Sequence, residues 1–252
     1  MFLVRWFKFS LIFTSNFTCF FIHSLSLPWD LRRTLPRLAE QIYDNGAGAV
    51  PIVFLASVFV GLTTAVQTGY QLLGIVPNYF LGIGVGRMLL IELGPVFAAF
   101  IVASRSASAM AAEIGTMRIS EQVDALKVMG IDPYRFLCLP RILATTISLP
   151  ILVVLMEVVS SLTALLVSDR LGVSRDTFLY GLIHFVKIRD FWGGLVKAIL
   201  FGLLIGTSGC YFGFQVEAGA GDVGRATTKA VVLAAVLILI FDFVLAVLIF
   251  SR

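Results

Sequence analysis

The fold is decided by residues 92–133, which read ELGPVFAAFIVASRSASAMAAEIGTMRISEQVDALKVMGIDP. The first half is apolar and rich in Gly, Ala and Ser, whereas the second half carries charged residues and stops at Gly130 and Pro133. Small residues let helix backbones approach closely inside a bilayer, and an amphipathic charged segment suits an aqueous surface. The stretch therefore predicts a membrane helix that continues into a short surface helix.

The composition of the whole chain excludes a soluble domain. Of 252 residues, 59% are hydrophobic and only 13% are charged. Roughly 20 consecutive apolar residues cross a bilayer as a helix, and the apolar runs here are that long without the alternation of a β-barrel. The chain is therefore predicted to be an all-α integral membrane protein.

Five membrane-spanning helices account for the apolar runs. Gly94-Pro95 should bend the second of them and Pro150 should kink the third, because proline cannot donate to the helical ladder. A shorter helix is predicted over 176–186. The five predicted spans cover residues 49–72, 81–112, 141–167, 191–214 and 230–250.

The segment before the first span is predicted to be an N-terminal region of interfacial helices, residues 1–47, ahead of a five-span domain, residues 48–252. Residues 1–27 resemble a signal peptide with a small-x-small pattern at 24–26. Basic residues resume soon afterwards, so an uncleaved helix in the membrane interface is the favoured alternative. A second interfacial helix is predicted over 36–46, beginning at a proline and ending at a glycine.

The distribution of basic residues predicts the orientation. With the N-terminus in the cytoplasm, the inner segments hold about twice as many Lys and Arg residues as the outer segments, as the positive-inside rule requires. The net charge of +4 is thus attributed to membrane topology, and no nucleic-acid partner is expected. This orientation places residues 119–129 in the cytoplasm.

Residues 119–129 form an amphipathic pattern. Val123 and Leu126 share one face, whereas Glu121, Asp124 and Lys127 lie on another. Ser120 is expected to cap the start of this helix, and the following Gly and Pro to end it. The helix either lies on the bilayer or docks a soluble partner.

Ionisable side chains inside the predicted spans include those of Glu92, Glu157, Lys197 and Asp242. Such groups are costly in hydrocarbon and usually face a cavity or one another. Lys197 could pair with Glu157 or Asp242, or contact an anionic head group, and Glu92 could face a water-filled outer vestibule. An alternative function is a secondary transporter or channel that uses these carboxylates, although the five spans contain no inverted repeat.

Signatures of enzymes, metal sites and nucleotide sites are missing from the sequence. The three cysteines are far apart and the two histidines have no partner at ligand spacing, so no metal is expected. Residues 219–224 match GxGxxG, but they follow a membrane span rather than a strand and are expected to form a flexible turn. Without a P-loop or a catalytic cluster, the chain is expected to be neither an enzyme nor a binder of its own cofactor.

The pattern ELGPVxxAxxVAxRxxSAxAAEIGTMxxxEQxDALxVMGxDP over residues 92–133 resembles the signature of the MlaE-type permease family, the membrane subunits of MCE-associated lipid ABC transporters. The resemblance continues through 140–141, 197–211 and 224–232 and covers about residues 38–250. It implies a permease that moves phospholipids or related lipids between membranes. It also implies a homodimer, a cytoplasmic ATPase that binds ATP and Mg, and an outer MCE-domain protein.

The resemblance also implies roles for particular residues. The helix after the second span would couple to the ATPase through Ser120, Glu121, Gln122, Asp124, Ala125, Lys127, Val128 and Met129. A lipid cavity near the ELGP segment would involve Arg87, Glu92, Leu93, Pro95 and Val96. Many family members have Arg where this chain has Ile91, and Arg87 could replace it. The implied location is a bacterial inner membrane; a plastid inner envelope is less favoured, because no transit segment is visible.

Overall fold

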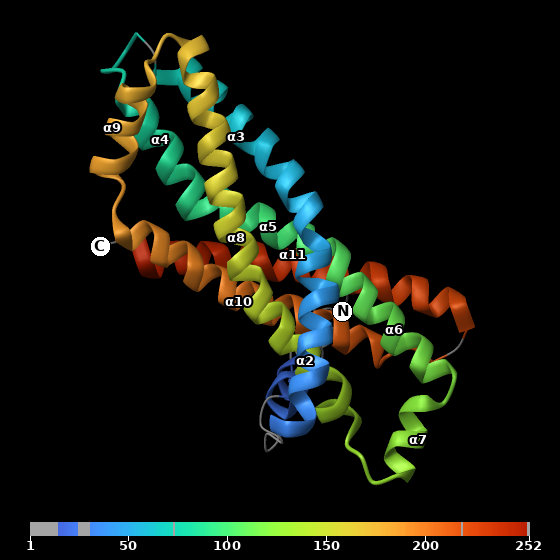
Figure 1. Cartoon of the computed structure of the whole chain (residues 1–252). Coiled ribbons are helices and arrows are strands. Elements are labelled where there is room, and N and C mark those ends of the chain that lie inside the picture. The colour runs from blue at the N-terminus through green and yellow to red at the C-terminus, as the bar shows by residue number, and fades with distance from the viewer. Residues whose placement is uncertain (1–14, 25–30, 73, 218, 251–252) are drawn as a thin grey trace, which may run out of the picture.

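The computed structural model describes residues 15–24, 31–72, 74–217 and 219–250, and the regular elements within these ranges are all helical. Five helical stretches in the described part are long and apolar enough to cross a membrane. They coincide with the five predicted spans. The structure therefore confirms an all-α integral membrane fold (Figure 1).

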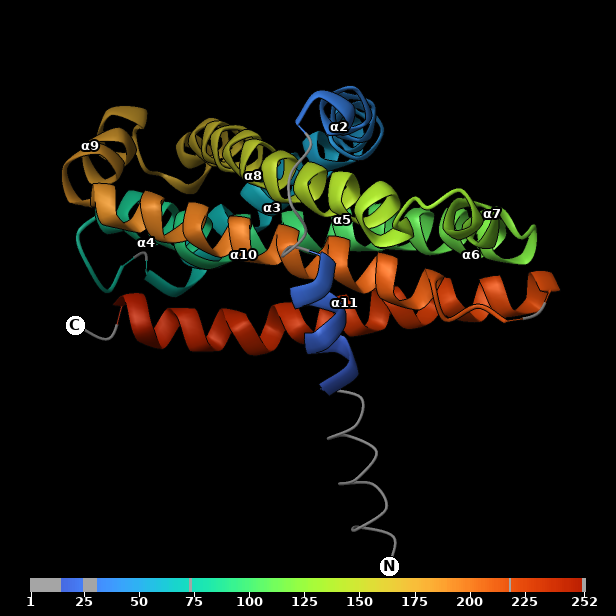
Figure 2. The same cartoon turned by 90° about the horizontal axis from the view of Figure 1, so that it is seen from below.

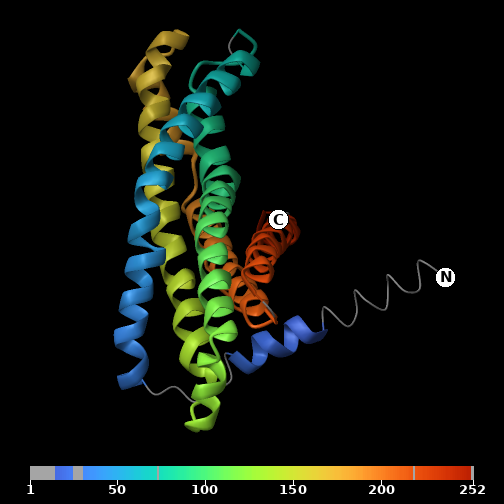
Figure 3. The ribbon, with the colours of Figure 1, turned by 90° about the vertical axis from the view of Figure 1, so that its right-hand side faces the viewer.

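The first span extends further toward the N-terminus than its apolar core. Helix α2 (Leu31–Asn45) leads through a short 3₁₀ turn, η1 (Ala47–Ala49), into α3 (Val50–Leu72), and Figure 3 shows the two helices following one direction. Gly46 ends α2 as predicted. The helix is longer than predicted, so Pro36 lies inside it rather than at its first position.

The second span is a single helical path with two wider π-helical segments. It consists of α4 (Phe80–Met88), η2 (Leu89–Leu93), α5 (Gly94–Val102), η3 (Ala103–Ala107) and α6 (Ser108–Ile119). The first π segment ends two residues before Pro95, whose missing N–H interrupts the helical ladder, and it lies next to the place where a bend was predicted. The span runs past the predicted end at residue 112.

The remaining elements follow in chain order. The short helix α7 (Gln122–Val128) follows the second span. The π segment η4 (Tyr134–Cys138) leads into α8 (Leu139–Ser168), which continues through Pro150. After η5 (Asp169–Leu171) comes α9 (Arg175–Phe185), close to its prediction. The last two spans are α10 (Ile188–Gly213) and α11 (Gly219–Phe250).

The prediction of a flexible turn at 219–224 was wrong. Helix α11 begins at Gly219, well before the predicted residue 230, and the GxGxxG match forms its first turns. A phosphate-binding loop needs exposed backbone N–H groups between a strand and a helix. The element that precedes this segment is the membrane-spanning helix α10 rather than a strand, so the segment lacks the setting of a nucleotide site.

The spans pack in layers. Helix α8 contacts α3 and α10, and α10 lies between α8 and α11, as Figure 2 shows. The residues at 15–24 form a separate helix that leaves the bundle (Figure 3) and makes edge contacts through Phe17 and Phe20 with Tyr211. The other parts of the predicted interfacial segment, 1–14 and 25–27, lie outside the described residues.

This packing can be tested by a substitution where α8 and α10 cross. A methyl group at Gly202 would lie 2.6 Å from the Thr145 carbonyl oxygen and 2.7 Å from Thr146 Cα, both backbone atoms. We expect Gly202→Ala to lower the free energy of unfolding by about 1–3 kcal/mol, as overpacking does. Thermal unfolding in detergent measures this, with Gly221→Ala as the control, since nothing lies within 4 Å of that site. Equal melting temperatures for both variants would contradict the predicted crossing.

Candidate functional site

A buried lysine ties three spans together. Lys197 on α10 has a side chain with no exposed surface, and its Nζ lies 2.9 Å from Glu92 Oε2 and 2.8 Å from Asp242 Oδ1. The same Nζ donates to the Ile91 carbonyl oxygen at 3.0 Å. Glu92 belongs to the second span and Asp242 to the fifth. One ammonium group therefore connects spans two, four and five.

The local sequence explains why this lysine meets the second span at that point. Pro95 has no N–H, so the α-helical bond to the Ile91 carbonyl cannot form, and Lys197 supplies the donor instead. Gly194, one turn before Lys197, allows the approach, because a side chain there would collide with the Leu90 carbonyl oxygen. The proline and the glycine thus position the ion pairs.

The structure shows which of the two predicted carboxylates, Glu157 or Asp242, pairs with Lys197. Asp242 is a partner and Glu157 is not: both carboxylate oxygens of Glu157 are buried and have no hydrogen-bond partner among the described residues. Glu92 also pairs with Lys197, while 41% of its side chain remains exposed. Glu92 is therefore held in a structural tie rather than standing free in a vestibule.

The other residues of the predicted lipid cavity are dispersed. Arg87 lies 3.4 Å from Asp190 and donates to the Phe185 carbonyl oxygen, so it faces α9 and α10. Pro95 is buried, and Val96 packs against the main hydrophobic core. Among the predicted cavity residues, the structure places Leu93 alone in the cavity described next.

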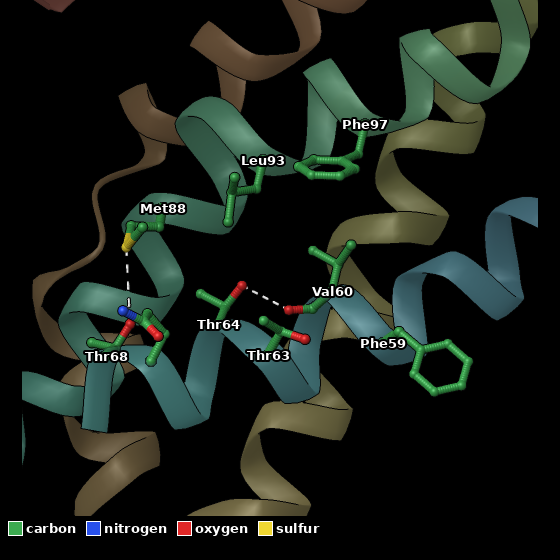
Figure 4. Close-up of a pocket in the computed structure, with 9 residues that line it drawn as sticks. Phe59, Val60, Thr63, Thr64, Thr68, Met88, Leu93 and Phe97 are labelled. Atoms are coloured by element: carbon green, nitrogen blue, oxygen red, sulfur yellow. Dashed lines mark hydrogen bonds between the residues drawn. The ribbon is translucent and has the colours of Figure 1, made fainter. Parts of the chain in front are cut away.

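A cavity of about 360 Å³ lies between α3 and the second span (Figure 4). Helix α3 contributes residues at i and i+4 spacing, and the second span closes the other side. Residues at this spacing lie on one face of a helix, so the spacing could have predicted this wall of the cavity from the sequence. The lining residues are Phe59, Val60, Thr63, Thr64, Gln67, Thr68, Met88, Leu93 and Phe97.

The polar groups of this cavity differ in availability. Thr64 Oγ1 donates to the Val60 carbonyl oxygen at 2.7 Å, and Thr68 contacts the Met88 sulfur at 3.9 Å (Figure 4). The side chains of Thr63 and Gln67 are exposed and make no hydrogen bond within the described part of the chain. An apolar cleft with a few polar groups suits a ligand with a hydrocarbon chain and a hydrogen-bonding head.

The opposite end of the second span carries α7, which projects from the bundle in Figure 1. Val123 is fully buried, whereas Val128 and Met129 are 89% and 64% exposed. The predicted cap at Ser120 was wrong: its hydroxyl donates to the Thr116 carbonyl oxygen. The helix starts after Glu121, which has φ of +59° and makes the sharp turn between α6 and α7.

The charged face of α7 is organised around Asp124. Lys127 Nζ lies 2.7 Å from Asp124 Oδ1, and Arg118 lies 3.7 Å from the same oxygen. The hydrogen bond from Lys127, and then the charges of Lys127 and Arg118, hold the pKa of Asp124 below its ordinary value. Asp124 therefore remains ionised to a lower pH than a free carboxylate, and α7 presents a fixed charge pattern beside its exposed apolar tip.

These features define a multi-pass membrane protein of the permease type. Its described residues contain no group of His, Cys, Asp or Glu that could hold a metal ion. It has five apolar spans, a cavity open to one side of the bundle and a charged helix projecting from one end.

Comparison with known proteins gives the family. The chain matches the permease MlaE family over residues 38–248 and belongs to it. It is 36% identical over 220 residues to a probable ABC transporter permease protein of Rickettsia typhi, covering 86% of this chain and 84% of that one. The chain is therefore a permease of an ABC transporter of the MlaE family.

Two further relatives carry names that mention lipids. The chain is 32% identical over 223 residues to the intermembrane phospholipid transport system permease protein MlaE of Haemophilus influenzae, covering 88% of this chain and 85% of that protein. It is 34% identical over 208 residues to the chloroplastic protein TRIGALACTOSYLDIACYLGLYCEROL 1 of Arabidopsis thaliana, covering 82% and 59%. Relatives of this kind thus occur in bacteria and in a plant.

The ion pairs of Lys197 can be tested by removing the cation. Lys197→Met leaves Glu92 and Asp242 without a counterion. We expect the free energy of unfolding to fall by about 3 kcal/mol, the lower end of the range for a broken buried pair because Glu92 is partly exposed. Combining Lys197→Met with Glu92→Gln and Asp242→Asn should recover part of this loss, since the unpaired carboxylates are gone. A single variant as stable as the wild-type protein in thermal unfolding would reject the tie.

Proposed function

We propose that this permease moves phospholipids or related lipids between membranes, driven by a separate ATPase subunit that docks on α7. The observation that carries the proposal is the exposed tip of α7. Val128 and Met129 present apolar surface next to a fixed set of charges, at the end of the span whose other half borders the cavity. Exposed apolar side chains beside ordered charges are typical of a protein–protein contact.

The lipid cavity is proposed to be the cleft between α3 and the second span. Its volume, about 360 Å³, is suited to part of one lipid, with the acyl chain between Phe59 and Phe97. Thr63 and Gln67 have free hydrogen-bonding groups for the ester or head-group oxygens. This assignment keeps Leu93 from the earlier set and replaces the remainder, because the other members make contacts elsewhere.

The path from ATPase to lipid is proposed to be the second span itself. Ser120, Glu121, Gln122, Asp124, Ala125, Lys127, Val128 and Met129 would form the contact with the ATPase, which would bind ATP and Mg. A push on α7 would pass through α6 to the π segments, where the ladder is already widened and can change its spacing. The cavity wall at Met88 and Leu93 flanks the first of these segments.

Further partners belong to the same proposal. The cavity is open on one side, where Phe59 is 60% and Phe97 is 42% exposed, so a second copy of this chain would close it. The loop between α3 and α4 exposes Ile75, which suits an MCE-domain protein at that end. The charge distribution supports a bacterial inner membrane with the N-terminus and α7 in the cytoplasm. A plastid envelope remains the second location, in view of the plant relative.

The ATPase contact is tested by reversing charges. Glu121→Lys with Asp124→Lys should abolish co-purification of the ATPase, because both carboxylates become cations while the membrane helices are untouched. Affinity purification of the complex from membranes measures this. Glu217→Lys is the matched control, since Glu217 is also exposed and outside the spans. Recovery of the ATPase with the α7 variant would reject docking on this helix.

The lipid cavity is tested by filling it. Thr63→Trp places an indole in the cleft from an exposed position on α3, and Phe54→Trp on the same helix lies outside the cleft and serves as control. We expect co-purified phospholipid, measured by mass spectrometry, to fall more than about tenfold for Thr63→Trp, equivalent to roughly 1.4 kcal/mol of binding. Equal lipid content in both variants would reject this cavity as the lipid site.

A further inference from the structure

A second cavity lies on another side of the bundle, between α8, α9 and the start of α10. Its volume is about 460 Å³, and it shares no lining residue with the cleft beside α3. Its walls are mainly apolar, with Leu162 on α8, Leu182 on α9 and Phe191 on α10. A carboxyl group, that of Glu157, also lines it. The volume falls within the range of about 300–1,000 Å³ that is usual for small-molecule sites.

Glu157 is the unusual feature of this cavity. The residue is only 3% exposed, and neither carboxylate oxygen has a hydrogen-bond partner in the described part of the chain. Two glycines leave room for it: a methyl group on Gly94 would lie 3.0 Å from Glu157 Cγ, and one on Gly194 would lie 3.2 Å from Oε1. The backbone of two spans is therefore shaped around a carboxyl group that the protein itself does not satisfy.

The cation nearest in sequence to Gly194, Lys197, already pairs with two other carboxylates. Lys197, one turn beyond Gly194, binds Glu92 and Asp242 with its ammonium group. A buried carboxylate without a cation or a donor is costly, and inside a membrane protein such groups usually mark a ligand or ion path. A charged donor forms the strongest hydrogen bond to a carboxylate. The complement missing from this cavity is thus an ammonium group attached to hydrocarbon.

We propose that this cavity binds an amphiphile that carries a primary ammonium group on a hydrocarbon chain, with the ammonium on Glu157 and the chain along the apolar walls. The ligand enters from the bilayer, because the apolar residues Val158 and Leu162 at the cavity are 51% and 55% exposed. Lys187 lies at the rim and is exposed, so a phosphate next to the ammonium would meet a cation there. The site is separate from the proposed lipid cleft.

The full-length chain provides a reporter for binding. Of its three tryptophans, Trp192 adjoins the cavity residue Phe191, with ring centroids 6.0 Å apart. Replacing Trp6 and Trp29 by Phe leaves Trp192 as the source of the fluorescence signal. Dodecylamine, titrated into the protein in detergent, should give a saturable change, whereas dodecanol should bind more weakly by about tenfold or more.

Variants assign that preference to the carboxyl group. Glu157→Gln should lower dodecylamine affinity more than about tenfold and leave dodecanol affinity unchanged; Glu40→Gln, at an exposed position on α2, should change neither. Ser161→Phe fills the cavity from α8 with Glu157 intact and should weaken both ligands. This second variant keeps the test valid if Glu157→Gln fails to fold. Equal affinity for amine and alcohol, or amine binding unaffected by both cavity variants, would overturn the proposal.

Two further measurements determine which kind of amine the cavity binds and whether this cavity is separate from the cleft beside α3. Lysophosphatidylethanolamine has the ammonium and lysophosphatidylglycerol lacks it, so Glu157-dependent binding of the former supports an aminophospholipid. Binding confined to dodecylamine supports a simple hydrophobic amine. Thr63→Trp should leave amine binding unchanged, because that residue lines the other cleft. Loss of amine binding in Thr63→Trp would overturn the assignment to a separate site.

Discussion

The bundle depends on one buried ammonium group. Lys197 carries a charge with no exposed surface, and three oxygens from two other spans surround it. In an apolar interior such a charge is tolerable only when its partners are in place, so spans two, four and five must assemble together. Because Ile91 contributes a backbone carbonyl freed by Pro95, the helix irregularity and the ion pairs require one another.

The same irregularity lies between the two cavities for which ligands are proposed. The π segment before Pro95 widens the second span. Gly194 brings the α10 backbone close to the Leu90 carbonyl oxygen of that span, and Gly94 leaves room for Glu157 of α8. On the other side, α3 and the second span leave the cleft proposed for lipid. Glu157 lies where Gly94 and Gly194 make room for it. The second span therefore has the carboxyl group of Glu157 on one side and the cleft with Thr63 and Gln67 on the other.

The second span also joins the proposed sites to α7. It is helical from Phe80 to Ile119, and the turn at Glu121 separates it from the exposed helix that follows. A continuous helix with two π segments is the proposed path for displacement from an aqueous end to a cavity wall within the bilayer. This arrangement is consistent with a permease of the MlaE family. The sequence of this chain has no P-loop motif, and the proposed source of energy is a separate ATPase subunit.

The sequence by itself determined the number of spans, their type and the position of α7, because apolar length and helical spacing are local properties of the chain. It also placed Glu92, Glu157, Lys197 and Asp242 inside the spans. Only the tertiary structure decided that Lys197 pairs with Glu92 and Asp242 while Glu157 has no partner. Pairing depends on how helices rotate and cross, and those angles follow from contacts between residues distant in sequence. The spacing of residues on α3 marks one wall of the cleft in the sequence, but only the folded chain shows that the second span forms the other wall.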